Sequence, residues 1–357
     1  MLGSIDIKGV VVLVKSLQYY VTGHTAKGFV NYLKENIQGI RKIITLKHPS
    51  NALKTDIFKK LLNHYEASYD VEVFLSSNGE DHLDGFIIKE LSFGVITDDL
   101  MDKGVETEFF DLEKMVPVSE QAWEIVSTIE ASFQKAYDHF RKALLIHDDL
   151  EAVYIKEMDF SKADKLAEEF IHQNLGKFQV KNESSRISRR LFGTNTYQGA
   201  VNIVPQLLER VSHRYYLKGR AGTGKSTFMR AVISSLEKLG MDMEIYHCSF
   251  DPESIDMVLV PEADFCIFDS TSPHEFFPEA GQGTIIDLYE KTVTPGTDER
   301  FSKSIDSITN YYKNEITKAM TQIKVARKFQ IALEKEISYR KEDVETVRKK
   351  IMEIHGK

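Results

Sequence analysis

The chain contains one internal repeat, and this repeat limits the folds that are open to it. A shift of 171 positions aligns seven identical residues in order: Thr25 with Thr196, Gly28 with Gly199, Val30 with Val201, Asn31 with Asn202, Leu46 with Leu217, Lys47 with Lys218 and Lys54 with Lys225. The order continues with slightly larger shifts, from VEVFLSS at 71–77 and MEIYHCS at 243–249 to YIKEMDFSKAD at 154–164 and LEKEISYRKED at 333–343. Unrelated segments would not keep this order, so the sequence indicates a duplication.

The duplication predicts two domains, residues 1–180 and residues 181–357, and a length of 357 residues fits two domains of ordinary size. Each copy reads as a strand, a loop, a helix, two more strands and a long helical region. In the second copy we expect a strand at 215–217, a helix from Ser226 to Leu239 that ends at Gly240, and strands near 243–248 and 264–268. Alternation of strands and helices predicts an α/β fold with parallel sheets.

Each copy ends in an amphipathic helical region. Apolar residues recur there at spacings of three and four: Trp123, Val126, Ile129, Phe133, Tyr137, Phe140 and Leu144 in the first copy, and Ile305, Ile308, Tyr312, Ile316, Met320 and Ile323 in the second. We expect these helices to pack within the protein rather than to form a coiled coil with a partner.

The segment GRAGTGKST at 219–227 has the pattern of a phosphate-binding loop (P-loop). Glycines allow positive φ angles and bring backbone N–H groups close to phosphate oxygens, and the following helix directs its positive end at the anion. Lys225 would place a positive charge near the β and γ phosphates, and Ser226 would offer a hydroxyl to Mg²⁺. The residues expected to hold the nucleotide are Gly219, Arg220, Ala221, Gly222, Thr223, Gly224, Lys225, Ser226 and Thr227.

A P-loop site also needs an acidic residue at the end of a neighbouring apolar strand to hold Mg²⁺. FCIFD at 265–269 supplies Asp269, so Ser226 and Asp269 are the predicted metal ligands. Glutamate does not follow Asp269, so the usual catalytic base of an ATPase is missing at that position. His274, Glu275 and Asp251 are the candidates for orienting water or a substrate hydroxyl.

The counterpart of this loop, HPSNALKT at 48–55, keeps Lys54 and the hydroxyl of Thr55 but has lost the glycines. His48, Asn51 and Leu53 stand where Gly219, Gly222 and Gly224 do, and Thr97 stands where Asp269 does, with Asp98 one position later. A leucine at the last glycine position resists positive φ. We therefore expect a degenerate loop in the first copy, whose domain persists for structure or to complete the intact site.

Taken with the loop glycines, HCSFDPESIDMVLVPE at 247–262 and DSTSPH at 269–274 resemble an uncharacterised bacterial family of tandem P-loop ATPase-like proteins, also described as nucleotide kinases. The resemblance covers nearly the whole chain, including GHTAKGF at 23–29 and GTNTYQGA at 193–200. It implies a duplicated P-loop fold and ATP binding, and it implies no substrate.

These patterns predict binding of ATP with Mg²⁺, since a guanine-reading Asn-Lys-x-Asp motif is missing, and hydrolysis that drives a nucleotide-dependent switch. Two alternatives stay open. One is a kinase with an acceptor pocket near Asp251, His274 and residues 281–283. The other is a nucleotide-sensing scaffold without turnover that binds a protein partner. The oligomeric state is also open: the two halves could face each other as an internal pseudo-dimer, or two chains could form a homodimer.

A net charge of −8 disfavours broad binding to nucleic acid. Cys248 and Cys266 lack metal-ligand spacing and read as buried thiols, which predicts a reducing, cytoplasmic location. The apolar run at 10–14 is too short to span a membrane or to serve as an ordinary signal segment.

Overall fold

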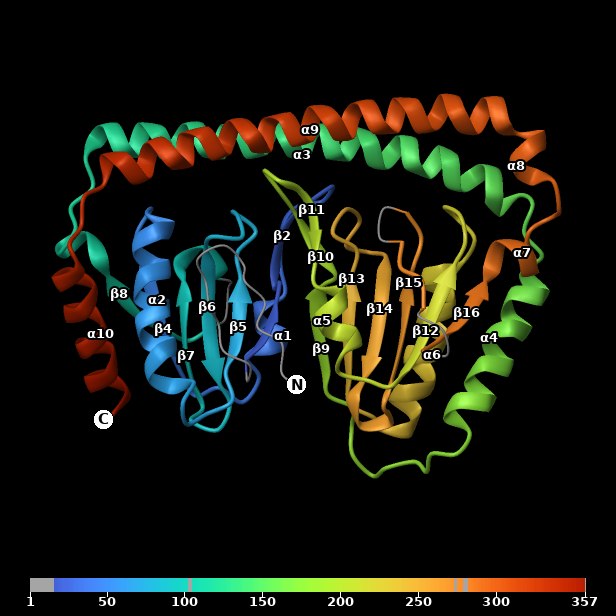
Figure 1. Ribbon diagram of the computed structural model, residues 1–357, viewed down its shortest axis with the longest axis horizontal. Helices are drawn as coiled ribbons and strands as arrows, with labels where there is room; N and C mark the ends of the chain where they lie inside the picture. Colours follow the sequence, from blue (N-terminus) through green and yellow to red (C-terminus); the bar gives the residue numbers. More distant parts are fainter. Residues whose placement is uncertain (1–15, 102–104, 273–274, 279–281, 357) are drawn as a thin grey trace.

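The computed structural model describes residues 16–101, 105–272, 275–278 and 282–356. We call residues up to 180 the first half and the remainder the second half. Each half contains a six-stranded sheet, a small hairpin and helices, and the two sheets lie side by side beneath a pair of long helices, α3 and α9 (Figure 1). The chain is therefore an α/β protein whose halves repeat one architecture.

The two halves contain equivalent elements in the same order, except that two short α-helices, α7 and α8, lie between the last strand and the long helix of the second half and have no α-helical counterpart in the described part of the first half. The first half contains β1 (Leu17–Tyr19), β2 (Thr22–Thr25), β3 (Gly28–Asn31), α1 (Leu33–Asn36), β4 (Lys42–Lys47), α2 (Asn51–Tyr65), β5 (Glu72–Leu75), β6 (Leu83–Ile88), β7 (Phe93–Thr97), β8 (Glu108–Asp111), α3 (Glu120–Ile155) and α4 (Phe160–Leu175). The second half contains β9 (Ile187–Leu191), β10 (Gly193–Thr196), β11 (Gly199–Asn202), α5 (Val204–Leu208), β12 (His213–Lys218), α6 (Lys225–Leu239), β13 (Met243–His247), β14 (Ile255–Val260), β15 (Phe265–Asp269), β16 (Thr284–Asp287), α7 (Leu288–Thr292), α8 (Thr297–Arg300), α9 (Ser302–Glu336) and α10 (Lys341–His355).

The strand orders are equivalent, β1-β5-β6-β7-β4-β8 in one sheet and β9-β13-β14-β15-β12-β16 in the other. The sheets are mixed, because β6 and β14 each run antiparallel to both neighbours. The expectation of parallel sheets is wrong at these strands. Only residues 89–92 and 261–264 join β6 to β7 and β14 to β15, and a parallel connection needs a crossover of about a dozen residues or more.

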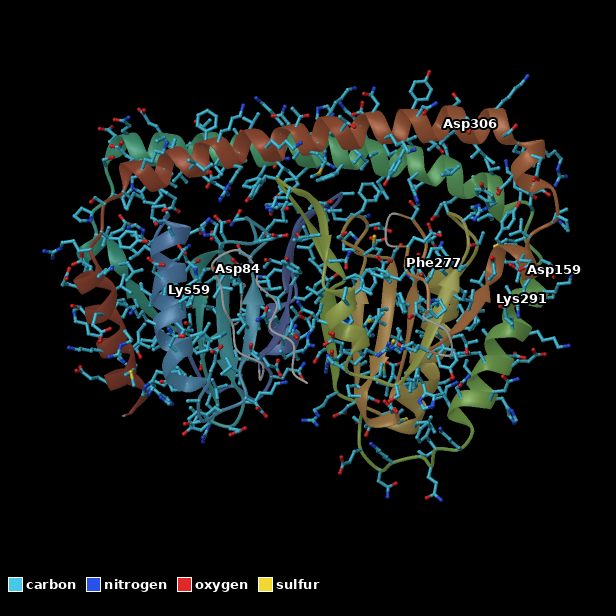
Figure 2. The ribbon with its side chains drawn as sticks, in the orientation of Figure 1. Lys59, Asp84, Asp159, Phe277, Lys291 and Asp306 are labelled. Atoms are coloured by element: carbon cyan, nitrogen blue, oxygen red, sulfur yellow. The ribbon has the colours of Figure 1, made fainter. Side chains whose placement is uncertain are left out.

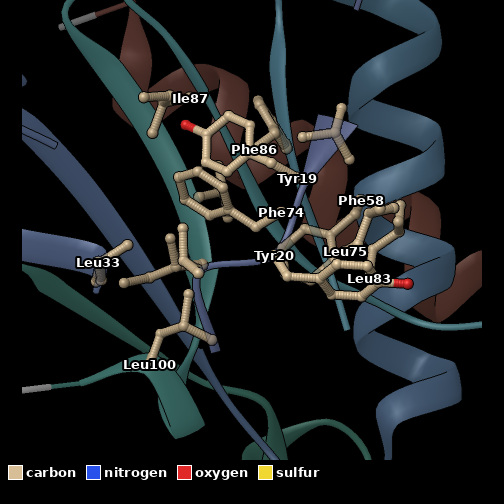
Figure 3. Packing of buried hydrophobic residues seen from close by; sticks show 14 of the residues in the cluster. Tyr19, Tyr20, Leu33, Phe58, Phe74, Leu75, Leu83, Phe86, Ile87 and Leu100 are labelled. Carbon is tan, nitrogen blue, oxygen red and sulfur yellow. The ribbon is translucent and has the colours of Figure 1, made fainter. Parts of the chain in front are cut away.

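Apolar side chains from strands and helices fill the cores. In the first half, Phe58 of α2 meets Phe86 of β6 edge-on with ring centroids 6.4 Å apart (Figure 3). In the second half, Phe228 of α6 packs against Phe170 of α4 at 5.4 Å. The helix α6 ends at Gly240, whose φ of 68° is left-handed, as the sequence predicted.

The helical regions cross between the halves. α3 runs from the first half over the second, α9 runs back antiparallel beside it, and α4 and α10 then pack on the opposite half from the one that precedes them in sequence (Figure 1). Tyr215 of β12 hydrogen-bonds Asn174 of α4, and Tyr65 of α2 hydrogen-bonds His355 of α10. The long amphipathic helices therefore pack within the protein, as predicted, but each half is completed by helices from the other.

None of the helices in the described part of the chain is both long and apolar enough to cross a membrane.

Candidate functional site

The second-half loop, Gly219–Thr227, joins the end of β12 to the start of α6, in the strand–loop–helix order that the sequence predicted. Gly222 and Gly224 have left-handed φ angles of 72° and 82°. A Cβ on Gly222 would lie 2.6 Å from the Glu151 carbonyl oxygen of α3, so this glycine is required by packing as well as by backbone conformation. The last turns of α3 therefore lie directly on the loop.

Hydrogen bonds within the loop hold its shape. The buried Thr223 hydroxyl donates to the Arg220 carbonyl and accepts from the Arg220 N–H, at 2.9 and 3.1 Å. Gly219 is also buried, Ala221 is partly buried and Thr227 is exposed. The two hydrogen bonds between Thr223 and Arg220 hold residues 220–223 as a tight turn.

Lys225 begins α6, and its Nζ donates to the Arg220 carbonyl at 2.7 Å and lies 3.6 Å from Asp269 Oδ2. Asp269 ends β15, next to β12 in the sheet. Its Oδ1 accepts hydrogen bonds from both the N–H and the hydroxyl of Thr271, which orient the carboxylate. The structure therefore brings together the lysine and the aspartate that the sequence placed in one site.

Ser226, the predicted hydroxyl ligand, contacts the backbone of Ile255 at the start of β14. Its Oγ accepts from the Ile255 N–H at 3.1 Å and lies 3.3 Å from the Ile255 carbonyl oxygen. In the first half, Thr55 Oγ1 accepts from the Leu83 N–H at 3.0 Å in the equivalent place. The hydroxyl thus has a structural contact in both halves, and a second lone pair would remain for a metal ion.

Arg220 ties the loop to the helices that surround it. Its guanidinium forms an ion pair with Asp298 of α8 at 3.0 Å and lies 4.6 Å from the ring centre of Tyr289 of α7. Asp298 also accepts from the Tyr154 hydroxyl of α3 at 2.9 Å. A ligand that attracted Arg220 would act on α3 and α8 together.

The predicted catalytic bases that the structure describes, Asp251 and Glu275, form hydrogen bonds or ion pairs with neighbouring residues. Asp251 accepts from the Glu253 N–H and the Ser254 hydroxyl within its own turn, at 3.2 and 2.9 Å. Glu275 forms an ion pair with Lys218 at 3.1 Å. His274 lies outside the described residues.

Asp256 is a carboxylate that the sequence interpretation missed as a site residue. It lies in β14, 6% exposed, directly beyond the paired residues Met257 and Phe268, so it faces Asp269 across the antiparallel pair. Burial, and next the Asp269 carboxylate, raise the pKa of Asp256 to about 8 against the opposing effects of Cys248 and Lys225. A signal was present in the repeat, because an aspartate interrupts both apolar segments, HLDGFII and SIDMVLV.

The first-half loop, His48–Thr55, differs in backbone as well as in side chains. α2 already begins at Asn51, the counterpart of Gly222, whereas α6 begins only at Lys225. Without the left-handed glycines, the helix of the first half begins three residues earlier than its counterpart does. Ser50 caps α2 by accepting from the Leu53 N–H at 3.0 Å.

Two further features close the first-half loop. The buried Lys54 pairs with Asp98 and Asp99 at 2.9 and 3.3 Å; burial would lower the pKa of Lys54, but these carboxylates raise it. Glu334 of α9 accepts from the Ala52 N–H and from the Ser50 hydroxyl. A carboxylate of the chain itself therefore lies at the helix N-terminus, where an anion is favoured.

Among the described residues, no group of three or more His, Cys, Asp or Glu side chains is arranged to hold a metal ion. A P-loop does not require such a group, because Mg²⁺ there takes ligands from phosphates and water and only one or two from the protein. Two surface cavities of about 560 and 620 Å³ lie away from the second-half loop, one of them between the halves beside Asn36 and Arg186.

Comparison with protein-family models, with curated proteins and with solved structures found no match to this chain. The resemblance to tandem P-loop ATPase-like proteins thus stays a prediction. The geometry of the second-half loop and its neighbours is the evidence that bears on function.

Proposed function

We propose that the second half binds ATP with Mg²⁺ at Gly219–Thr227 and hydrolyses it, and that the first half binds no nucleotide. The observation that carries the proposal is the contrast between the two lysines. Lys225 faces a glycine loop in the left-handed conformation and lies near one carboxylate, whereas Lys54 is neutralised by two carboxylates beside a helix that Glu334 already caps.

The residues of the second-half loop have distinct parts in this proposal. Backbone N–H groups between Gly219 and Ser226 bind phosphate oxygens, with the N-terminus of α6 contributing its dipole. Lys225 exchanges its bond to the Arg220 carbonyl for the β and γ phosphates, where it stabilises charge that develops in the transition state. Ser226 and Asp269 hold the Mg²⁺, which neutralises phosphate charge when it is bound.

The test is phosphate release by the full-length chain with Mg²⁺ and ATP. We expect Lys225→Ala to lower the rate by at least about 100-fold, in the range seen when a group that stabilises transition-state charge is removed. The matched control is Lys54→Ala, which removes the same side chain from the first half and should leave the rate unchanged. Equal phosphate release by the wild type and Lys225→Ala would contradict the proposal.

The same assay separates hydrolysis from the two alternatives. A kinase would form ADP without free phosphate, and only when an acceptor is added. A nucleotide-sensing scaffold would bind ATP and form neither product.

A further inference from the structure

Asp256 is a buried carboxylate that the proposed ATP site does not yet use. Four titratable groups influence it: Asp269 of β15, Lys225 of α6, Cys248 after β13 and Asp251 in the turn that precedes β14. Asp269 and Asp251 are carboxylates that disfavour its charge, whereas Lys225 and a hydrogen bond with Cys248 favour it. Two neighbouring carboxylates are unfavourable unless one is protonated or a cation lies between them, and Lys225 forms an ion pair with Asp269 rather than with Asp256.

The equivalent residue of the first half, Asp84, is likewise a buried aspartate near the start of its strand, β6. It lies at the end of the sheet that faces α3 and α9, and the Thr22 hydroxyl donates to its Oδ2 at 2.9 Å (Figure 2). Thr22 pairs with Asn31 in the first hairpin, and Gly193 pairs with Asn202 in the second. Because Asn31 and Asn202 are equivalent residues of the repeat, Gly193 occupies the place of Thr22. The second half has therefore lost one of the two side chains that hydrogen-bond the carboxylate in the first, and it keeps the other as Cys248 in place of Ser76.

The local chain places Asp256 next to the predicted metal ligands. The preceding residue, Ile255, contacts Ser226 through both its N–H and its carbonyl oxygen, and Asp256 itself faces Asp269. A hydroxyl and two carboxylates from three different elements thus lie at the same end of the sheet. Oxygen ligands of this kind suit Mg²⁺.

We propose that Asp256 and Asp269 together hold the Mg²⁺ of the bound nucleotide, so that two neighbouring strands each contribute a carboxylate to the ion. The proposal rests on ATP binding at the second-half loop. It assigns to β14 a part in the site that the P-loop pattern alone does not include.

The experiment uses Mn²⁺ in place of Mg²⁺, a non-hydrolysable ATP analogue and the full-length chain, with bound Mn²⁺ measured by electron paramagnetic resonance. Asp256→Asn keeps the shape of the side chain and removes its charge. We expect it to weaken Mn²⁺ binding by about 10- to 100-fold, as loss of a group that supports a metal site does. Binding of the analogue in EDTA should equal that of the wild type.

The matched control is Asp84→Asn, which makes the same change at the equivalent buried position and should leave Mn²⁺ binding unchanged. A second measurement needs no variant: Fe²⁺ bound in place of Mg²⁺, with ascorbate and peroxide, cleaves the backbone near the ion. Wild-type protein should be cut near residue 256 and near residue 269, and only when the analogue is present.

The outcomes distinguish this inference from the proposed function. Analogue binding together with wild-type Mn²⁺ affinity in Asp256→Asn, or with no cleavage near residue 256, would overturn the role of Asp256 and leave ATP binding standing. Failure of the wild type to bind the analogue would overturn both.

Discussion

Gly224 and Leu53 occupy equivalent positions, and the difference between them determines where each helix begins. At Gly224 the chain takes a φ of 82° and α6 starts one residue later, whereas Leu53 already lies in the first turn of α2. A left-handed residue with a side chain is unfavourable by about 1–2 kcal/mol. The backbone N–H groups of the first-half loop consequently form hydrogen bonds at the start of α2, with the Ser50 hydroxyl and with Glu334.

Gly224→Ala tests this conclusion. A Cβ there would meet only the mobile end of Met158 at 3.4 Å, so the main effect is backbone strain. We expect the free energy of unfolding to fall by about 1–2 kcal/mol and ATP binding to weaken. Gly28→Ala is the control, because its φ is 96° with nothing within 4 Å of the added Cβ. It should lose similar stability in denaturant titration and retain ATP affinity; equal loss of affinity in both variants would contradict the account.

The position of Lys225 near Asp269 could be predicted at the level of residues, because the P-loop pattern depends on a local run of glycine, lysine and serine. The position of Asp256 opposite Asp269 could not be predicted, since it depends on the antiparallel pairing of β14 and β15. Glu334 reaches Ser50 from 284 positions away, and no local pattern predicts such a contact.

At the scale of elements, periodicity predicts which face of a helix is buried but not what it is buried against. The apolar stripes at 123–144 and 305–323 correctly indicated packing within the protein. They could not show that α10 packs against α2 in the core of the first half, or that α4 packs against α6 in the core of the second half. Alternation of strands and helices did not predict that β6 and β14 are antiparallel. The four-residue connections after these strands are too short for a parallel crossover.

The exchange of helices predicts an effect at a distance in sequence. Ile351 of α10 is fully buried with the first half, so Ile351→Ala should destabilise the protein by about 2–5 kcal/mol. Hydrogen exchange should then quicken in α2 more than in α6. Phe170→Ala in α4 should show the opposite pattern. Faster hydrogen exchange confined to α6 in Ile351→Ala would contradict the packing of α10 on the first half.

At the scale of the whole molecule, a buried charge network joins the two halves. Arg190, 1% exposed, stacks on Tyr19 of the first half at 3.6 Å and forms an ion pair with Glu244 at 2.7 Å. Arg210 also binds Glu244, with two hydrogen bonds of 2.6 and 2.7 Å. Glu72 of the first half also pairs with Arg190, at 3.5 Å, so two carboxylates balance the two arginines and Glu244 is the one that both arginines share.

This network predicts a pH dependence of stability. Burial would raise the pKa of Glu244, but Arg190 and Arg210 outweigh burial and lower it to about 2 from an ordinary 4.5. The depressed pKa means that the stabilisation is present above pH 4.5 and is lost as the pH falls towards 2. Glu244→Gln should lower the free energy of unfolding by about 1–3 kcal/mol at neutral pH, since the buried Arg190 and the partly exposed Arg210 both lose a carboxylate while Arg190 keeps its ion pair with Glu72.

Thermal melts of both proteins across this pH range provide the check. The difference in stability between the wild type and Glu244→Gln should shrink as the pH falls from 4.5 to 2. A difference that stays constant would show that the charge of Glu244 does not support the contact between the halves.

The central claim is that duplication has left one working nucleotide site in a molecule with two similar halves. The most direct measurement is the number of Mg²⁺–ATP analogue molecules bound per chain, obtained by calorimetric titration of the wild type, Lys225→Ala and Lys54→Ala. We expect one site in the wild type, none in Lys225→Ala and one in Lys54→Ala. Two sites in the wild type, or loss of the site in Lys54→Ala with retention in Lys225→Ala, would contradict it.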